Sequence, residues 1–166
     1  MTTIARLRVL PLAAALCAAL SVAACTNDKD LADASGFGAG AASPGSAQDF
    51  VVNVGDRVFF ESDSTDLTPT ATATLDKQAQ WLQRYPRYTF LIEGHADERG
   101  TREYNFSLGA RRAQSVNDYL ASRGIAAGRI RTVSYGKERP VAVCNDISCW
   151  SQNRRAVTVL DRGAGS

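Results

Sequence analysis

The chain has 166 residues, 45% of them hydrophobic and 22% charged, which is typical of one folded domain with additional segments. Its formal net charge is +2, and Arg6 and Arg8 lie in the first 24 residues, which contain no acidic residue. Without these two, 17 of the 19 basic side chains remain against 17 acidic ones. Nucleic-acid-binding proteins concentrate Lys and Arg against phosphates, so this balance argues against a nucleic-acid partner.

The first 24 residues have the pattern of a secretory signal peptide, because Arg6 and Arg8 precede an apolar run at 9–20 and then small residues. This run is shorter than the roughly 20 apolar residues that span a bilayer. The tetrapeptide VAAC, which ends at Cys25, resembles the lipobox of bacterial lipoproteins, where cleavage leaves an acylated cysteine first. We therefore predict a signal peptide over 1–24 and lipidation of Cys25. The alternative is a plain secretory signal with an incidental cysteine.

The segment after Cys25 is predicted to be a flexible tether that ends at residue 48. Gly, Ala, Ser and Pro dominate it and no hydrophobic periodicity is present. Several acyl chains on Cys25 would anchor the protein stably in a membrane. Thr26 stands where enteric lipoproteins kept at the inner membrane carry Asp, so the sequence favours the outer membrane, with the domain facing the periplasm. A folded domain is expected over 49–162, followed by a disordered tail at 163–166.

The predicted elements of this domain follow in chain order. A β-rich run at 56–60 precedes a helix that begins at Thr68-Pro69, a capping hydroxyl followed by proline at the first helical position. The remaining elements are a strand at 88–92, a helix at 102–123, and strands at 129–135 and 156–160. The strand at 88–92 is almost continuously apolar, so we expect both of its faces to be covered. The order β-α-β-α-β-β predicts an α+β fold with helices packed on a mixed sheet.

The candidate binding residues lie where the second strand ends and the second helix begins. Asp97 offers a carboxylate that only accepts hydrogen bonds, and Arg112 offers a planar fork of donors suited to a carboxylate. Asn105 and Arg112 are two helical turns apart, so both can face the turn that carries Asp97. The pattern fits a zwitterionic ligand whose ammonium binds Asp97 and whose carboxylate binds Arg112.

Five segments, at 58–67, 94–100, 104–113, 133–140 and 152–157, cover nearly the whole domain in order. They include GHADERG, YNFSLGARRA and VSYGKERP. Together they resemble the signature of OmpA-like peptidoglycan-binding domains. The chain as a whole is similar to the lipoprotein members of that family that work with the Tol proteins.

This resemblance implies a function and a set of site residues. The family binds meso-diaminopimelate in the stem peptides of peptidoglycan, a residue whose side chain ends in an ammonium and a carboxylate. By motif position the family's ligand-binding residues fall on Asp97, Arg112, Asn105 and Leu108, while Phe60 and Glu61 border the ligand groove. No cofactor or metal is implied.

The resemblance also implies partners. The protein would hold the outer membrane to the cell wall, support envelope integrity, and help the outer membrane invaginate during cell division. Its Tol-system partners would include a periplasmic β-propeller that competes for the peptidoglycan-binding face.

Cys144 and Cys149 remain for other chemistry once Cys17 is removed with the signal peptide and Cys25 is acylated. Exported proteins meet an oxidising compartment, so a disulfide that stiffens their loop is favoured over two free thiols or a metal site. Enteric members of the family lack this cysteine pair, so the loop leaves the main site intact, but the family's partner contacts on this rim do not carry over to it.

The motif residues also allow other interpretations. Asp97 and Arg112 could form only an internal salt bridge, and His95 is favoured as a packed structural residue over a catalytic one. A zinc site formed by His95, Asp97 and the cysteines has no closely spaced ligand pair to support it. Arg154-Arg155 could meet an anionic partner, although a solvated pair at a strand edge is favoured.

Two other classes of function compete with a wall anchor. An exported wall hydrolase would need a nucleophile or metal constellation, and one histidine without an accompanying motif does not predict one. A motor-stator or porin-linked anchor would use the same domain with a transmembrane helix or a barrel. We therefore predict a binding protein that is not an enzyme.

Overall fold

The structure is a computed structural model, which describes residues 42–161. The predicted signal peptide, Cys25, most of the tether and the C-terminal tail lie outside the described residues. The helices are α1 (Ala47–Asp49), η2 (Phe50–Val54), α2 (Pro69–Arg84), α3 (Arg102–Ser122), η3 (Ala127–Arg129) and α4 (Ile147–Asn153). The strands are β1 (Arg57–Phe59), β2 (Phe90–His95), β3 (Ile130–Gly136) and β4 (Arg155–Leu160). Within the described range, no helix has the length and apolar character needed to cross a membrane.

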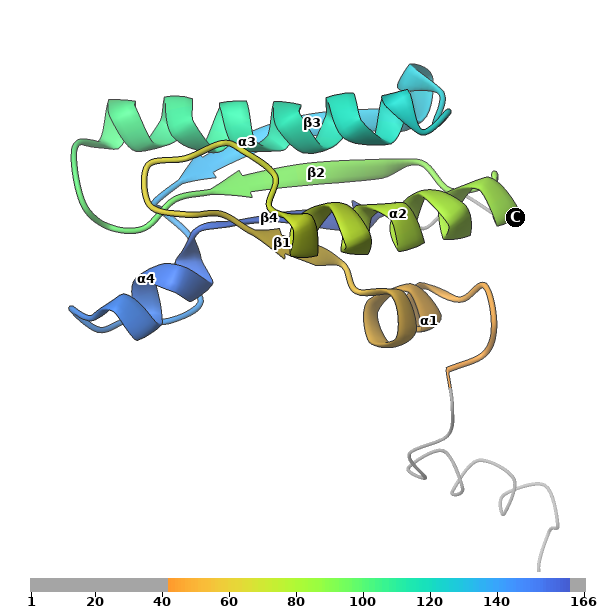
Figure 1. Cartoon of the computed structure of the whole chain (residues 1–166), viewed down its shortest axis with the longest axis horizontal. Helices are drawn as coiled ribbons and strands as arrows, with labels where there is room; N and C mark the ends of the chain where they lie inside the picture. The colour runs from red at the N-terminus through yellow and green to blue at the C-terminus, as the bar shows by residue number, and fades with distance from the viewer. Residues whose placement is uncertain (1–41, 162–166) are drawn as a thin grey trace, which may run out of the picture. The chain divides into compact units, whose positions relative to one another are not determined.

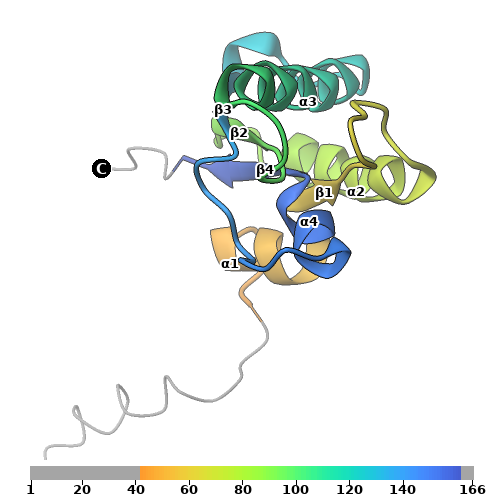
Figure 2. The same cartoon turned by 90° about the vertical axis from the view of Figure 1, so that its left-hand side faces the viewer.

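The four strands form one mixed sheet in the order β1-β4-β2-β3. Strands β2 and β3 are parallel, whereas β4 runs antiparallel to both β1 and β2. Helices α2 and α3 lie side by side on one face of this sheet (Figures 1 and 2). The predicted α+β class and the mixed sheet are confirmed.

The hydrophobic core lies between this helical layer and the sheet. Strand β2 alternates, since Phe90 and Ile92 are fully buried while Leu91 and Glu93 are only partly covered. The prediction that this strand is covered on both faces is therefore wrong. A half-exposed second face is common in sheets with antiparallel pairs, and β2 has an antiparallel neighbour on one side.

Helix ends follow the predicted local chemistry. The Thr68 side chain accepts a hydrogen bond from the Ala71 amide and Pro69 opens α2. Gly124 has φ of 87°, and this left-handed conformation prevents α3 from continuing. The short helix α4 was not predicted, because its seven residues carry no clear apolar repeat.

The folded part begins earlier than the predicted boundary at Asp49. The Tyr88 hydroxyl donates to the Gly45 carbonyl at 2.8 Å, and Trp81 Nε1 donates to the Asp49 carboxylate at 2.8 Å. Phe50 is fully buried and packs on the Trp81 ring at 4.9 Å. Residues 45–48 are thus part of the domain rather than tether, because Tyr88 supplies the hydrogen-bond partner of Gly45 and Trp81 that of Asp49.

Helix α3 approaches β2 closely through two glycines. A Cβ added to Gly94 would lie 1.8 Å from the Gly109 carbonyl oxygen, and one added to Gly109 would lie 2.5 Å from the Ser134 hydroxyl. Because the first obstacle is backbone, no side-chain rotation relieves it. These glycines set the distance at which the first turns of α3 sit above the end of β2.

We expect Gly94→Ala to lower the free energy of unfolding by about 3 kcal/mol or more, because overpacking at a backbone contact forces α3 away from the sheet. Gly128→Ala is the matched control, since a Cβ there meets nothing within 4 Å, and should change stability by less than about 0.5 kcal/mol. Urea denaturation measures both. Equal stabilities for the two variants would contradict this account of the packing.

Candidate functional site

The candidate site begins at the turn between β2 and α3. The Ala96 amide donates to the Gly136 carbonyl at 2.8 Å, which fixes the chain just before Asp97. Gly100 has φ of 86°, and the Thr101 side chain caps α3 by accepting from the Tyr104 amide. The Asp97 carboxylate is thereby held at the edge of the sheet, beside the start of the helix.

Asn105 holds this turn together from inside. Its buried side-chain amide donates to the Arg99 carbonyl at 2.7 Å and to the Thr101 carbonyl at 3.0 Å. Both carbonyls belong to the turn or its end, so Asn105 sets the shape of the segment that carries Asp97. Its structural role is thus direct, and Asn105 also lines the hollow beside this turn.

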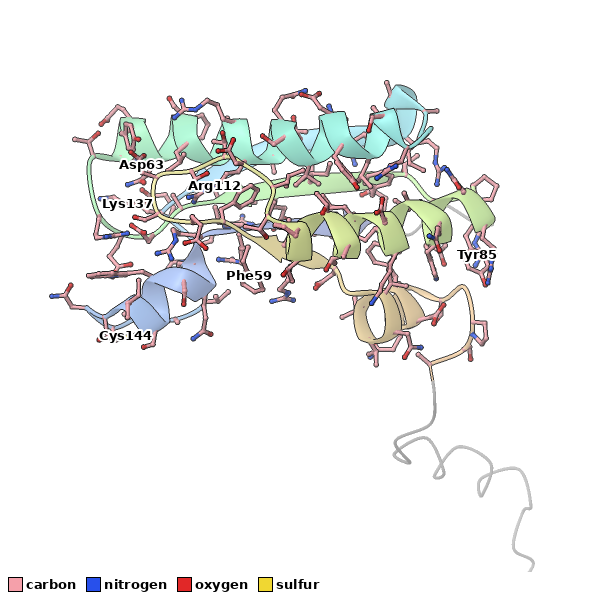
Figure 3. The ribbon with its side chains drawn as sticks, viewed as in Figure 1. Phe59, Asp63, Tyr85, Arg112, Lys137 and Cys144 are labelled. Atoms are coloured by element: carbon pink, nitrogen blue, oxygen red, sulfur yellow. A yellow bond between two sulfur atoms is a disulfide. The ribbon has the colours of Figure 1, made fainter. Side chains whose placement is uncertain are left out.

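The turn, the start of α3 and the loop after β1 surround a hollow of about 230 Å³. Its lining includes three of the predicted site residues, Asp97, Asn105 and Leu108, and also Ser62, Asp63, Arg99, Gly100 and Tyr104. Figure 3 places Asp63, Arg112, Lys137 and Cys144 toward the same end of the sheet, whereas Tyr85 lies at the opposite end.

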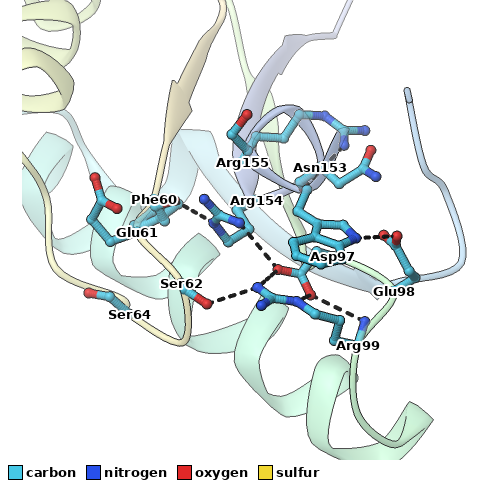
Figure 4. Close-up of polar contacts among 12 residues, drawn as sticks. Phe60, Glu61, Ser62, Ser64, Asp97, Glu98, Arg99, Asn153, Arg154 and Arg155 are labelled. Carbon is cyan, nitrogen blue, oxygen red and sulfur yellow. Dashed lines mark hydrogen bonds and ion pairs between the residues drawn. The ribbon is translucent and has the colours of Figure 1, made fainter. Parts of the chain in front are cut away.

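Two arginines pair with Asp97 (Figure 4). Arg99 donates through Nη2 to Oδ2 at 2.6 Å and through Nε to Oδ1 at 3.1 Å, and its backbone amide donates to Oδ1 at 3.2 Å. Arg154 Nη1 lies 3.4 Å from Oδ2. Burial alone would raise the pKa of Asp97, but the hydrogen bonds from Arg99 and then Arg154 outweigh it and keep this pKa below its ordinary value. Asp97 is therefore ionised at neutral pH.

Arg112 is buried and is not among the residues that line the hollow. Its side chain is 0% exposed and donates to the carbonyls of Ser64 at 2.9 Å, His95 at 2.8 Å and Glu61 at 3.1 Å. Burial, followed by the nearby charge of Arg154, lowers the pKa of Arg112 to about 10, so it remains protonated at neutral pH. Because Asp97 pairs with Arg99 and Arg154, the alternative of an Asp97–Arg112 structural salt bridge is wrong.

Phe60 and Glu61 do not line the hollow at Asp97. They border a neighbouring hollow of about 320 Å³, together with Arg154 and residues of α4. The Phe60 ring lies under the Arg112 guanidinium at 5.1 Å, and the Phe60 carbonyl accepts from Arg154 at 3.0 Å. Their contribution to the site is thus mainly to hold the two buried arginines.

Five residues that line the hollow were not predicted as site residues: Ser62, Asp63, Arg99, Gly100 and Tyr104. The Tyr104 hydroxyl donates to the Asp63 carboxylate, and Asp63 has φ of 55°. Polar side chains in the run from Glu61 to Asp66 were the available signal. That run predicts a loop, but not which wall of the site it forms.

The expectation that Arg154-Arg155 forms a solvated pair at a strand edge is wrong. Both side chains are buried. Arg154 binds Phe60 and Asp97, while Arg155 Nη2 donates to the Arg139 carbonyl at 3.2 Å. Strand β4 lies between β1 and β2, so the start of β4 faces other segments and not solvent.

His95 is a packed residue outside the hollow. It is 2% exposed, its ring lies 5.6 Å from the Tyr135 ring, and Nε2 lies 3.5 Å from the Glu93 carboxylate. Burial, then the charges of Arg155 and Arg139, lower its pKa to about 4. The imidazole is therefore neutral at physiological pH.

The buried His95 makes stability depend on pH. Its pKa is about 4 in the folded protein, below the ordinary value of 6.5, so between these values the unfolded chain binds the extra proton. Stability is then lost as pH falls, and we expect a loss of roughly 2 kcal/mol between pH 7 and pH 5. Chemical denaturation at a series of pH values measures it. His95→Gln should remove most of this slope, and an undiminished slope in the variant would contradict the assignment.

The cysteine loop connects to the site through α4. Cys144 and Cys149 are joined by a disulfide, with their Cα atoms 5.7 Å apart. The next residue, Trp150, lies against the Arg99 guanidinium at 4.2 Å and donates from its indole to the Glu98 carboxylate. The disulfide loop therefore leads directly into Trp150, which contacts Arg99, and Arg99 in turn pairs with Asp97.

No group of three or more His, Cys, Asp or Glu residues between 42 and 161 is placed to hold a metal ion. The hollow is lined by two carboxylates, those of Asp97 and Asp63, and the guanidinium groups of Arg99, Arg154 and Arg112 lie near Asp97. Such a site can bind a small zwitterion or anion through charge-assisted hydrogen bonds.

A family model and a similar protein both relate this chain to the OmpA family and its lipoproteins. Residues 59–154 match the model of the OmpA family. The chain is 64% identical over 169 residues to the peptidoglycan-associated lipoprotein of Rhizobium meliloti (strain 1021), covering 100% of this chain and 94% of that protein.

Two solved structures have the same fold. The crystal structure of the peptidoglycan-associated lipoprotein from Burkholderia pseudomallei is 37% identical with a TM-score of 0.66, and the match covers 70% of this chain and all of that one. The C-terminal domain of Helicobacter pylori MotB matches with a TM-score of 0.61 over 66% of this chain and 86% of that one. At 22% identity this second likeness concerns the fold alone.

Proposed function

Since the chain belongs to the OmpA family, in its group of peptidoglycan-associated lipoproteins, we propose that its folded domain binds peptidoglycan reversibly and without a covalent bond. The ligand is the free end of meso-diaminopimelate in a stem peptide, where one carbon carries an ammonium and a carboxylate. The binding site is the hollow that contains Asp97.

The observation that carries this proposal is the ionised Asp97 carboxylate in the lining of the hollow, with the guanidinium groups of Arg99, Arg154 and Arg112 near it. Its charge attracts the ligand ammonium, and the presence of Asn105 and Leu108 in the lining of the same hollow supports their contact with the ligand. Arg99, Arg112 and Arg154 surround Asp97 with more positive charge than it neutralises. The excess favours the carboxylate of the same ligand end.

Arg112 supports this site by binding the segments around it. Three of its N–H groups hold the carbonyls of Glu61, Ser64 and His95, so it joins the loop after β1 to the end of β2. A guanidinium has five N–H groups, and its positive charge persists at neutral pH. We therefore propose that the positive charge of Arg112 favours the carboxylate of the ligand. Phe60 and Glu61 hold Arg112 in place.

We propose that the domain binds the wall without hydrolysing it. The histidine on which acid–base chemistry would depend, His95, is 2% exposed and packs against Tyr135. It is not among the residues that line the Asp97 hollow. The hollow supplies groups for recognition, and recognition is sufficient for a cross-link between two layers of an envelope.

The second attachment is the lipid that we propose on Cys25. Acyl chains there would place the protein on the outer membrane with its domain in the periplasm, so that one molecule joins membrane and wall. The lipoprotein names of the relatives support the lipid. We propose further that Tol-system proteins, including a periplasmic β-propeller, bind this protein and couple it to envelope integrity and to invagination of the outer membrane during division.

We expect Asp97→Asn to reduce binding to purified diaminopimelate-type sacculi by at least tenfold, because loss of one partner of a charged hydrogen-bonded pair typically costs about 2–5 kcal/mol. Co-sedimentation with sacculi measures the retained fraction. Asp118→Asn is the control, since Asp118 is exposed on α3 and accepts a hydrogen bond from Gln114. Circular dichroism verifies that both variants are folded. Wild-type retention by a folded Asp97→Asn protein would refute the site.

The lipid is tested separately. We expect Cys25→Ser to abolish incorporation of radiolabelled palmitate and to move the protein from the membrane fraction to the soluble periplasmic fraction, because the variant lacks the acylated sulfur. Its binding to sacculi should be unchanged. Palmitate label or membrane association equal to that of the wild type would contradict lipidation at Cys25.

A further inference from the structure

Arg99 occupies the position that the ligand ammonium needs. Its guanidinium binds both Asp97 oxygens, at 2.6 and 3.1 Å, and its Nη2 also donates to the Ser62 hydroxyl at 2.8 Å. Figure 4 shows this fork directed at the carboxylate. A ligand cation therefore reaches Asp97 only if Arg99 gives up at least one of these bonds.

Of the arginines around Asp97, Arg99 is the one whose environment permits movement. Its side chain is 43% exposed, whereas that of Arg154 is 5% exposed and Arg112 is fully buried. Arg154 and Arg112 also satisfy backbone carbonyls, which their departure would leave without partners. The side-chain partners of Arg99 are the Asp97 carboxylate and the Ser62 hydroxyl, together with the Trp150 ring. A partly exposed ion pair of this kind is weak enough to be exchanged.

The Trp150 ring provides a surface on which Arg99 can remain while it changes partners. The guanidinium carbon lies 4.2 Å from the ring centroid, a contact that depends on the face of the ring and not on a single hydrogen-bond direction. Trp150 is held in turn by the Glu98 carboxylate and follows Cys149 of the disulfide. The Arg99 guanidinium can therefore keep its contact with the Trp150 ring while it changes hydrogen-bond partners.

The chemistry of the ligand decides whether this exchange is favourable. A ligand end with only an ammonium displaces Arg99 from Asp97, and it offers the Arg99 guanidinium no new hydrogen-bond acceptor. A ligand end with an ammonium and a carboxylate on one carbon takes Asp97 with the first group and offers the second to the displaced guanidinium. A guanidinium fork and a carboxylate fit each other through two parallel hydrogen bonds.

We propose that Arg99 exchanges the Asp97 carboxylate for the ligand's carboxylate, and that this exchange makes the site select a zwitterionic diaminopimelate end over a lysine end. This inference rests on the proposed function. It assigns direct carboxylate contact to Arg99, and leaves Arg112 as the buried residue that positions the loop and adds positive charge. Arg99 is thus the specificity-determining residue.

The test compares two peptides that differ by one carboxylate. They are L-alanyl-γ-D-glutamyl-meso-diaminopimelate and the same peptide with L-lysine at the third position. Isothermal titration of the full mature chain in detergent gives an affinity for each. For the wild type we expect at least tenfold preference for the diaminopimelate peptide, since a charge-assisted hydrogen-bonded pair is lost with lysine.

For Arg99→Gln we expect the preference to fall below about threefold, through at least tenfold weaker binding of the diaminopimelate peptide and no loss of lysine-peptide binding. Arg131→Gln is the matched control. Arg131 pairs with Asp161 at 2.7 Å and is 67% exposed, and its replacement should leave both affinities unchanged. Thermal unfolding verifies that each variant is folded.

The other outcomes separate the possible failures. If Arg99→Gln weakens both peptides equally, Arg99 only shapes the site, and if it strengthens both equally, Arg99 only blocks it; either result overturns the exchange. Retention of the wild-type preference by the variant overturns it as well. If the wild type binds neither peptide, the proposed function itself fails, and the exchange fails with it.

Discussion

The site depends on a carboxylate kept ionised at the end of a buried strand. Asp97 lies where β2 leaves the sheet, and its charge is maintained there because Arg99 and Arg154 bind it more strongly than burial disfavours it. If this carboxylate were neutral, the hollow would lose the charge that we assign to the ligand ammonium. The packing of α3, the turn at Gly100 and the loop after β1 all serve to hold that charge at an accessible edge.

Buried arginines form the framework around this charge. Arg112 and Arg154 do not act mainly as ion-pair partners, because they bind backbone carbonyls of the loop after β1 and of the end of β2. A buried cation is costly unless its N–H groups are satisfied, and here carbonyls at the ends of irregular segments satisfy them. The same bonds fix those segments, which have few backbone partners of their own. The hollow thus has rigid surroundings before its ligand arrives, and the partly exposed Arg99 is the side chain that has to move.

The sequence was sufficient to predict what short-range chemistry determines. The cap at Thr68, the stop at Gly124, the four strands and the two long helices all followed from residues close in the chain. The proximity of Asp97 and Asn105 also followed, because a single turn joins them.

Long-range contacts determined what could not be predicted. Arg112 was expected at the surface of the site, but its partner Glu61 is 51 residues away. Arg154 was expected in solvent, but its partner Phe60 is 94 residues away. No local pattern locates such carbonyls, and for the same reason the contacts of Gly45 with Tyr88 and of Asp49 with Trp81 were not predicted. Similarity to a family identified three of the eight residues that line the hollow, Asp97, Asn105 and Leu108, and it predicted Arg112 and not Arg99 as the arginine of the site.

The most direct measurement is a crystal structure of the mature chain with a diaminopimelate-containing stem peptide. The account predicts the ligand ammonium within hydrogen-bond distance of the Asp97 carboxylate, with the adjacent ligand carboxylate on a guanidinium of the same hollow. A peptide bound on another face of the domain, with the Asp97 carboxylate still fully paired to Arg99, would contradict it.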